Sequence, residues 1–312
     1  MLVGAGTAVS EHRLLLFGGS GRLGSALQRE AGPGWTVIAP TRADLDLARV
    51  EVRDLQMWIK ASAPQVVLNA AAMAWVDACE EDPEGADRLN AYFPDALAKA
   101  CALEVIPLVH ISTDYVFGDE SMGNGAPYSE ESRTCPVQIY GVSKAKGEAA
   151  VLSSEGRSCV VRISWLTEPG EGSFVRYLLS QVRSGKKEVA VLRDQKTRPT
   201  MARGLCRWLL GLIKLLADGS TVPGVLHPAG CEPVSRGEWA EGILASLGYE
   251  GLEVIDDPGT AGGPDYTVQG ATQCALRPVD SSLDARFTMN WSRDQGLPVL
   301  EDWRKVLAGK VS

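Results

Sequence analysis

Apolar runs alternate with amphipathic segments through the first half of the chain. The run RLLLFG at residues 13–18 ends in glycines, and an amphipathic stretch follows from Arg22 to Glu30, which is typical of a strand, a tight turn and a helix. Further strand-like runs lie at 35–40, 65–72, 105–112, 158–164 and 188–192, and helical patterns include 48–62, 84–102 and 139–154. Because the strands are apolar throughout, we expect an α/β fold with a doubly wound parallel sheet.

The alternation weakens after about residue 165, where we expect a smaller C-terminal lobe that binds the substrate, with a long loop at 256–273. A Gly- and Pro-rich stretch at 118–137 is too long for a simple connection, so it predicts a loop near the site. The expected division gives residues 1–165 to the sheet domain, with 201–228 packing back on it, and residues 166–200 and 229–312 to the lobe.

Composition narrows the class of partner. The chain has 312 residues, of which 45% are hydrophobic, and a formal net charge of −8 without a dense Lys/Arg cluster. These features argue against nucleic-acid or membrane binding and favour a small-molecule partner. Since no apolar run reaches ~18 residues and the first residues lack a basic segment, we expect a cytoplasmic protein with a short, loose N-terminal extension.

Cysteines and histidines give little sign of a metal or disulfide site. The seven cysteines are scattered and never form a CxxC pair, and the three histidines are isolated from one another. We therefore predict no metal site. His110 lies in a predicted strand and is expected to be an ordinary core histidine, and Trp208 and Trp239 are expected in the core as well.

Three glycines form a GxxGxxG motif between the first strand and the first helix. Gly18, Gly21 and Gly24 would allow a tight turn and a close approach of the backbone to a ligand. The N-terminus of the helix then offers free N–H groups and a positive dipole end to a dinucleotide pyrophosphate. The alternative is a turn that serves packing alone.

The end of the second strand bears on the choice of dinucleotide. A chain that prefers NAD usually places an acidic residue there, whereas this chain has Thr41 and Arg42. Because a guanidinium group suits a 2′-phosphate, we predict NADPH as the cofactor, with NADH possible. An ordinary exposed arginine is the alternative interpretation of Arg42.

A tyrosine and a lysine four positions apart are the candidate acid and its partner. Tyr140 and Lys144 share a helix face in QIYGVSKAKGE, and an ammonium group lowers the pKa of a nearby phenol. Such a pair can donate a proton, although two polar residues on a solvated face would give the same spacing. Upstream, HISTDYVF places Ser112 and Thr113 at the carboxyl edge of the sheet, where Thr113 could hydrogen-bond a carbonyl oxygen.

These features together resemble the extended short-chain dehydrogenase/reductase family and, within it, the dTDP-4-dehydrorhamnose reductase group. The stretches that carry the resemblance, in family order from residue 14 to about 284, are GGSGRLG, TRADLDL, APQVVLNAAA, VDACE, LVHISTDYVF, PYSEES, YGVSKAKGE, VRISW, LRDQKTRPT and RPVDSSLD. The resemblance implies a Rossmann-type NADP-binding domain at 1–165 and a keto-sugar substrate.

The resemblance also implies roles for individual residues. Thr113, Tyr140 and Lys144 would be the catalytic triad. The residues that would line the cofactor are Gly18, Gly21, Arg22, Leu23, Gly24, Thr41, Arg42, Asp46, Leu47, Ala70, Ala71, Ala72, Tyr140 and Lys144. The residues predicted to face the substrate are Trp75, Tyr115, Trp165, Arg198 and Arg277, of which Trp75 and Arg198 are additions to the family pattern.

The chain departs from the family pattern mainly in its substrate-side motifs. The departures are Met73, Ala74 and Ala78 after the alanine run, Thr197 at a usual glycine, the additional Arg198, and Asp280 and Ser282 in place of Asn and Arg. One hypothesis is that Arg198 replaces the phosphate contact that Ser282 lacks. Ala26 stands where some members bridge a dimer through a metal, so we expect no such dimer and predict a monomer or a homodimer of another kind.

The leading hypothesis is NADPH-dependent reduction of the keto group of a nucleotide-linked deoxysugar, with the proton from Tyr140. Thr113 is followed by Asp114 and Tyr115 rather than by Asp and Glu, which disfavours a dehydratase. Two alternatives stay open. The chain could reduce a different keto-sugar in natural-product biosynthesis, or it could be a non-catalytic NADP-binding subunit that resembles the regulatory subunit of methionine adenosyltransferase.

Overall fold

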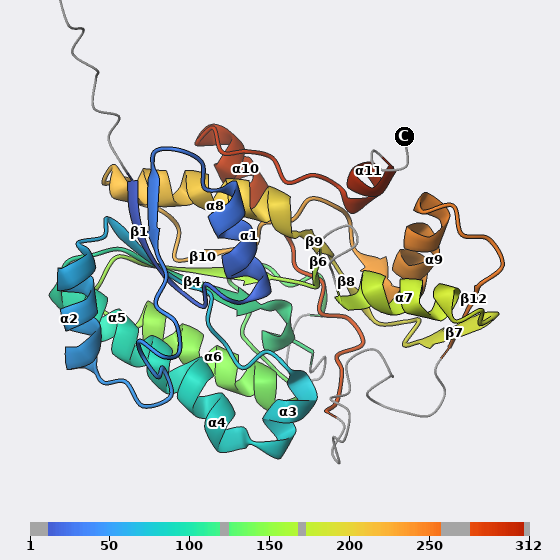
Figure 1. Ribbon diagram of the computed structural model, residues 1–312, viewed down its shortest axis with the longest axis horizontal. Coiled ribbons are helices and arrows are strands. Elements are labelled where there is room, and N and C mark those ends of the chain that lie inside the picture. Colours follow the sequence, from blue (N-terminus) through green and yellow to red (C-terminus); the bar gives the residue numbers. More distant parts are fainter. Residues whose placement is uncertain (1–11, 119–124, 168–172, 257–274, 309–312) are drawn as a thin grey trace, which may run out of the picture.

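A six-stranded parallel sheet forms the larger part of the molecule (Figure 1). The computed structural model describes residues 12–118, 125–167, 173–256 and 275–308, so the expected N-terminal extension and most of the loop at 256–273 lie outside the described residues. The strands are β1 (His12–Phe17), β2 (Trp35–Ile38), β3 (Val66–Asn69), β4 (Leu108–Thr113), β5 (Ser158–Ile163) and β10 (Val225–Leu226), in the order β10-β5-β4-β3-β1-β2. All five strand pairings are parallel, which confirms the predicted fold class.

Helices cover both faces of this sheet (Figure 1). One face carries α1 (Arg22–Glu30) and α8 (Ala202–Ala217), and the other carries α2 (Val52–Ser62), α5 (Phe93–Leu103) and α6 (Ile139–Leu152). Alternate side chains of β1 point to opposite faces of the sheet. Leu14 and Leu16 pack toward α8, while Leu15 and Phe17 pack toward α5. Burial on both faces explains why the strands are apolar at every position.

The helix expected at 84–102 is interrupted by a π-helical turn. The segment divides into α4 (Pro83–Asp87), the π-helix Arg88–Tyr92 and α5, after the short α3 (Val76–Glu81). Pro94 has no N–H with which to bond the carbonyl of Asn90, so the regular hydrogen-bond ladder cannot continue through this turn. The Asn90 side chain then bonds the backbone of Met73 at 2.9 and 3.0 Å, which fixes the chain just after β3.

The smaller part of the molecule packs around aromatic side chains. It contains α7 (Ser173–Arg183), α9 (Arg236–Ser246) and α11 (Trp303–Ala308), and β7 (Glu188–Val191) pairs in parallel with β12 (Glu253–Asp256). Its core includes Phe174, Trp239 and Trp303. Four two-residue strands connect the two parts: β6 (Leu166–Thr167), β8 (Lys196–Thr197), β9 (Thr200–Met201) and β11 (Val234–Ser235).

Two later segments return to the sheet. Helix α8 packs on α1, and β10 extends the sheet beside β5. Helix α10 (Arg286–Asp294), which we expected in the lobe, packs on α8, where Trp208 Nε1 donates to Ser292 Oγ at 2.9 Å. The division of the chain into a cofactor domain and a substrate lobe stays a proposal.

None of the helices among the described residues has the length and apolar character needed to span a bilayer.

Substitution of Gly147 tests the close contact between α6 and the π-helix. A Cβ atom at this position would lie 2.0 Å from the carbonyl oxygen of Asn90. Alanine is favoured over glycine in a helix by about 1 kcal/mol, but displacing the backbone costs about 1–3 kcal/mol. We therefore expect Gly147→Ala to lower the free energy of unfolding, measured by denaturant titration. In the control Gly204→Ala in α8, the nearest atom would be 3.6 Å away, so stability should be kept or gained; the same result for Gly147→Ala would contradict the close contact.

Candidate active site

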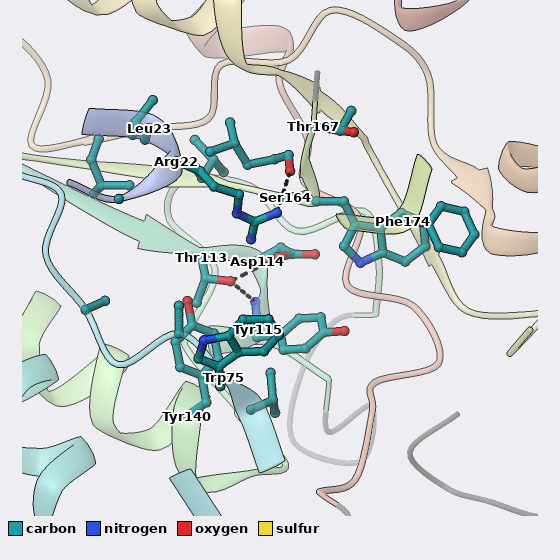
Figure 2. Close-up of a pocket in the computed structure, with 18 of the residues that line it drawn as sticks. Arg22, Leu23, Trp75, Thr113, Asp114, Tyr115, Tyr140, Ser164, Thr167 and Phe174 are labelled. Atoms are coloured by element: carbon teal, nitrogen blue, oxygen red, sulfur yellow. Dashed lines mark hydrogen bonds between the residues drawn. The ribbon is translucent and has the colours of Figure 1, made fainter. Parts of the chain in front are cut away.

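A pocket with a volume of about 940 Å³ opens at the carboxyl edge of the sheet (Figure 2). Its walls come from the turn after β1, the ends of β3, β4 and β5, the start of α6, and helices α7 and α9. The strand order reverses between β1 and β3, and parallel α/β sheets bind their ligands in the crevice at such a point. The larger and smaller parts of the molecule both contribute to it.

The glycine turn fits a dinucleotide pyrophosphate. Gly18 has a φ of +83°, and a Cβ atom there would lie 2.5 Å from the amide nitrogen of Ala71, while one at Gly24 would lie 2.2 Å from the oxygen of Gly18. Helix α1 begins after Gly21 without a side-chain cap, and Gly21, Arg22 and Leu23 line the pocket. The uncapped first turn leaves backbone N–H groups and the positive dipole end for an anion.

The pocket lining is rich in cations. Figure 2 shows Arg22 reaching across the pocket from α1, and its Nη1 donates to the carbonyl of Leu166 at 3.3 Å. The cationic side chains in the lining are Arg22, Lys144, Arg176, Arg236 and Arg277. Of the described residues that line it, Asp114 alone carries a carboxylate. The net positive lining favours a ligand with several negative charges.

Thr113 and Tyr140 meet at the floor of the pocket. The Thr113 hydroxyl donates to Asp114 Oδ1 at 3.1 Å and accepts the N–H of Tyr115 at 3.1 Å (Figure 2). We expected Lys144 to lower the pKa of the Tyr140 phenol, but burial raises it, and the largest opposing effect is the hydrogen bond with Thr113 rather than the charge of Lys144. The phenol therefore carries its proton at neutral pH, as a proton donor must.

Lys144 lies one helical turn after Tyr140 on α6, with its side chain buried. Its Nζ donates to the carbonyl of Ile111 at 2.7 Å and lies 3.2 Å from His110 Nε2. Burial lowers the pKa of Lys144 to about 8, and the Glu148 carboxylate acts in the opposite direction. His110 is fully buried, as expected of a core histidine, but it also contacts a candidate catalytic residue, which sequence reasoning missed. The available signal was its place three residues before Thr113 on the strand that α6 covers.

Hydroxyl groups from distant segments hold the Asp114 carboxylate. Thr197 Oγ1 and Ser281 Oγ donate to Oδ2 at 2.7 and 2.6 Å. Burial raises the pKa of Asp114, and these hydrogen bonds, that from Ser281 first, lower it. Thr197, a departure from the family motif, is thus a fully buried support of Asp114 and does not line the pocket.

Aromatic side chains form the wall toward the smaller part. Trp165, with a φ of +27°, stacks on Trp239 at 5.1 Å between ring centroids, and Trp239 stacks on Phe174 at 4.8 Å. The Arg236 guanidinium lies 4.1 Å from the centroid of the Trp165 ring and donates to Gln195 Oε1 at 2.8 Å. Trp239 is buried, as expected, but it also borders the pocket. No pattern in the sequence indicated that Arg236 would reach this wall.

Three other residues expected at the substrate also line the pocket. Trp75 is 56% exposed and lies across the pocket from Arg22 in Figure 2. Tyr115 accepts at its Oη from Gln195 Nε2 at 2.8 Å, and Arg277 pairs with the buried Asp77 at 3.0 Å.

Arg198 is not brought to the pocket. Its guanidinium donates to the carbonyl of Cys231 at 2.8 Å and lies 3.3 Å from Glu232, outside the pocket lining. It is therefore held away from the place where we expected it to replace the phosphate contact that Ser282 lacks.

The expected cofactor residues divide into two groups. Gly21, Arg22, Leu23, Ala70, Ala72, Tyr140 and Lys144 line the pocket. The others, Gly18, Gly24, Thr41, Arg42, Asp46, Leu47 and Ala71, lie outside the lining. Thr41 and Arg42 are exposed just after β2, and the Thr41 hydroxyl donates to Asp44 at 2.7 Å. Among the described residues, no group of three or more His, Cys, Asp or Glu is arranged to hold a metal.

Comparison with known proteins gives one consistent family. The model of the RmlD substrate binding domain matches residues 12–311. A dTDP-4-dehydrorhamnose reductase of Mycolicibacterium smegmatis is 33% identical over 310 residues, which cover 97% of this chain and 86% of that protein. A similar structure is dTDP-4-dehydrorhamnose reductase from Bacillus anthracis in complex with NADP, with a TM-score of 0.78 and 26% identity over 95% of this chain and 97% of that one. The reductase from Yersinia enterocolitica has a TM-score of 0.80 and 25% identity, covering 96% and 99%.

Substitution of Thr197 tests whether its hydrogen bond to Asp114 stabilises the protein. The substitution Thr197→Val keeps the shape of the side chain but removes one of the two donors to Asp114 Oδ2. Because the buried carboxylate then keeps Ser281 and Thr113 but loses one of its three hydroxyl donors, we expect the free energy of unfolding to fall by about 1–3 kcal/mol, measured by denaturant titration. Thr197→Ser keeps the hydroxyl and serves as the control. Equal stability of the valine and serine variants would contradict the role of this hydrogen bond.

Proposed function

The chain belongs to the RmlD substrate binding domain family, and from that premise we propose that it reduces the keto group of a nucleotide-linked deoxysugar with NADPH. The observation that carries the proposal is the convergence of Thr113, Tyr140 and Lys144 on one pocket that begins at the glycine turn of α1. The names of its relatives, dTDP-4-dehydrorhamnose reductases, supply the substrate class, and the NADP held by the similar Bacillus anthracis structure supports the cofactor.

The cofactor would lie along the carboxyl edge of the sheet. The N–H groups at the start of α1 would bind the pyrophosphate, and Ala70 and Ala72 leave room for the dinucleotide because their side chains are small. Arg42, exposed after β2, would meet the 2′-phosphate. The bound nicotinamide would supply a hydride to the carbonyl carbon of the sugar.

Tyr140 would donate the proton that completes the alcohol. Its raised pKa keeps the phenol protonated, so that it can donate when negative charge develops on the carbonyl oxygen. Thr113 has a single hydroxyl proton, which Asp114 accepts in this structure. To polarise the carbonyl, Thr113 would turn this proton toward the substrate, while Thr197 and Ser281 keep Asp114 hydrogen-bonded.

The charges and rings of the pocket suit the rest of such a substrate. Arg236 of α9 and Arg277, which pairs with Asp77 of α3, are cations that would attract the diphosphate. Trp165 and Trp75 would border the sugar. A different keto-sugar stays a second possibility, because the residues after the alanine run depart from the family pattern. A cytoplasmic location and a monomeric or homodimeric state are proposals of the same kind.

Tyr140→Phe tests the proposed acid. The variant keeps the ring and loses the donated proton, so kcat for NADPH oxidation with dTDP-4-dehydro-L-rhamnose should fall about 10²- to 10⁴-fold. Binding of NADPH, followed by fluorescence titration, should stay near the wild-type value. Tyr92→Phe, at an exposed tyrosine, is the control and should retain activity. Full turnover in Tyr140→Phe would refute the acid role, and a wild type that binds NADPH but never turns over would favour the non-catalytic subunit.

Arg42→Ala tests the preference for the phosphorylated dinucleotide. Loss of a charge-assisted contact of about 1.5–3 kcal/mol should raise the KM for NADPH roughly tenfold or more. The KM for NADH should change little, because NADH has no 2′-phosphate. Arg49→Ala, at an exposed arginine farther along the same loop, controls for the general loss of positive charge. An unchanged ratio of the two KM values in Arg42→Ala would contradict the assignment of Arg42 to the 2′-phosphate.

A further inference from the structure

A chain of polar contacts runs from the end of β3 to Lys144. Ala71 N–H donates to Asn69 Oδ1 at 3.0 Å, and Asn69 Nδ2 lies 3.0 Å from His110 Nδ1. On the other side of the ring, His110 Nε2 lies 3.2 Å from Lys144 Nζ, which also donates to the carbonyl of Ile111 at 2.7 Å. Asn69 and His110 are fully buried and Lys144 is 2% exposed, so water cannot replace these partners.

The backbone amide of Ala71 fixes the direction of each hydrogen bond in this series of contacts. The amide of Ala71 can only donate, so the oxygen of the Asn69 side chain must face it and the NH₂ group must face His110. His110 Nδ1 therefore accepts. Burial, together with the charge of Lys144, holds the pKa of His110 well below its usual value, so the ring is neutral. A neutral ring that accepts at Nδ1 carries its proton on Nε2, the nitrogen that faces Lys144.

This tautomer distinguishes between the two forms of Lys144. An ammonium group would place its own protons against the Nε2–H of His110, since both groups are donors. An amine has a lone pair that accepts this proton while one of its N–H groups still bonds the Ile111 carbonyl. We propose that His110 is a positioning residue whose fixed Nε2–H tautomer stabilises the neutral amine of Lys144. We also propose, on the basis of the proposed function, that it thereby sets the upper pH limit of the reduction.

The other groups around Lys144 do not remove this effect. The Glu148 carboxylate, one turn later on α6, favours the ammonium form of Lys144. This carboxylate also forms an ion pair with Arg162 of β5, with 2.7 Å between Arg162 Nη2 and Glu148 Oε2.

The other ionisable groups near Tyr140 are Asp114 and Tyr115 after β4 and Cys79 of α3. Burial raises the pKa of Tyr140, Tyr115 and Cys79, so these three groups are neutral. The lowered pKa of Lys144, about 8, means that the ammonium form prevails below pH 8 and is lost as the pH rises through that value. On the proposed function, an ammonium group one helical turn after Tyr140 would stabilise the phenolate that forms when the proton is donated, so reduction should decline over the same range.

The tautomer can be observed without any substrate. Long-range ¹H–¹⁵N spectra of the full-length protein labelled with ¹⁵N-histidine distinguish a protonated ring nitrogen from a bare one. The chain has only three histidines, and His110→Gln identifies the signals of His110. At pH 7 we expect a protonated Nε2 and a bare Nδ1. A protonated Nδ1, or a doubly protonated ring, would overturn the proposal whether or not the protein is a reductase.

Two substitutions of Asn69 test the link to Lys144. In Asn69→Asp the carboxylate accepts from both Ala71 N–H and His110 Nδ1–H, so the tautomer reverses and Nε2 accepts from the ammonium group. Asn69→Ala removes the orienting amide without adding charge, and the ammonium group then selects the same tautomer. In both variants the alkaline limb of the kcat profile should move up by about one pH unit.

Each outcome of the kcat measurement decides the question. A shift in both variants, accompanied by a bare Nε2 in the ¹⁵N spectra, supports the proposal. An unchanged limb despite a reversed tautomer would overturn the link to Lys144, and so would a shift in Asn69→Asp alone, because charge would then explain it. A protein without turnover would instead contradict the proposed function, while the ¹⁵N spectra would still decide the tautomer.

Discussion

Burial of the Lys144 amino group is the constraint on which the candidate site depends. An amino group away from water is costly unless it has polar partners, so α6 must lie where the Ile111 carbonyl and His110 are within reach. The same placement sets Tyr140, one turn earlier, beside Thr113 at the carboxyl end of β4. The tight contact of Gly147 with the π-helical turn lets α6 approach this closely. The packing of α6 therefore also sets the positions of the candidate catalytic side chains.

Charge and shape in the pocket agree on the kind of ligand. Five cationic side chains line it, and the carboxylate of Asp114 is engaged by hydroxyl groups from three segments. A dinucleotide and a nucleotide-linked sugar both carry phosphates, and such a lining lowers the free energy of each bound anion. The aromatic wall of Trp165, Trp239 and Phe174 offers an apolar surface for the uncharged part. These properties follow from residues of both parts of the molecule.

The sequence predicted the features that local patterns encode. Strands β1 to β5, the helix from Arg22 to Glu30 and the glycine turn depend on periodicity and on turn residues within a short window, whereas the two-residue strand β10 was not predicted. The features it missed depend on tertiary packing between distant segments. Arg236 reaches Trp165 only because α9 folds against the segment after β5, and Thr197 and Ser281 meet Asp114 across more than 80 residues. No pattern of spacing contains this information, and Arg198 likewise paired with Glu232 rather than reaching the pocket.

The transfer of hydride within this pocket is the central claim, and isotope transfer tests it most directly. The protein would be mixed with dTDP-4-dehydro-L-rhamnose and NADPH that carries deuterium on the transferring face of the nicotinamide C4, and the product would be analysed by mass spectrometry and NMR. The account predicts one deuterium per molecule, bound to the former carbonyl carbon. A product without deuterium, or no product although both ligands bind, would contradict it.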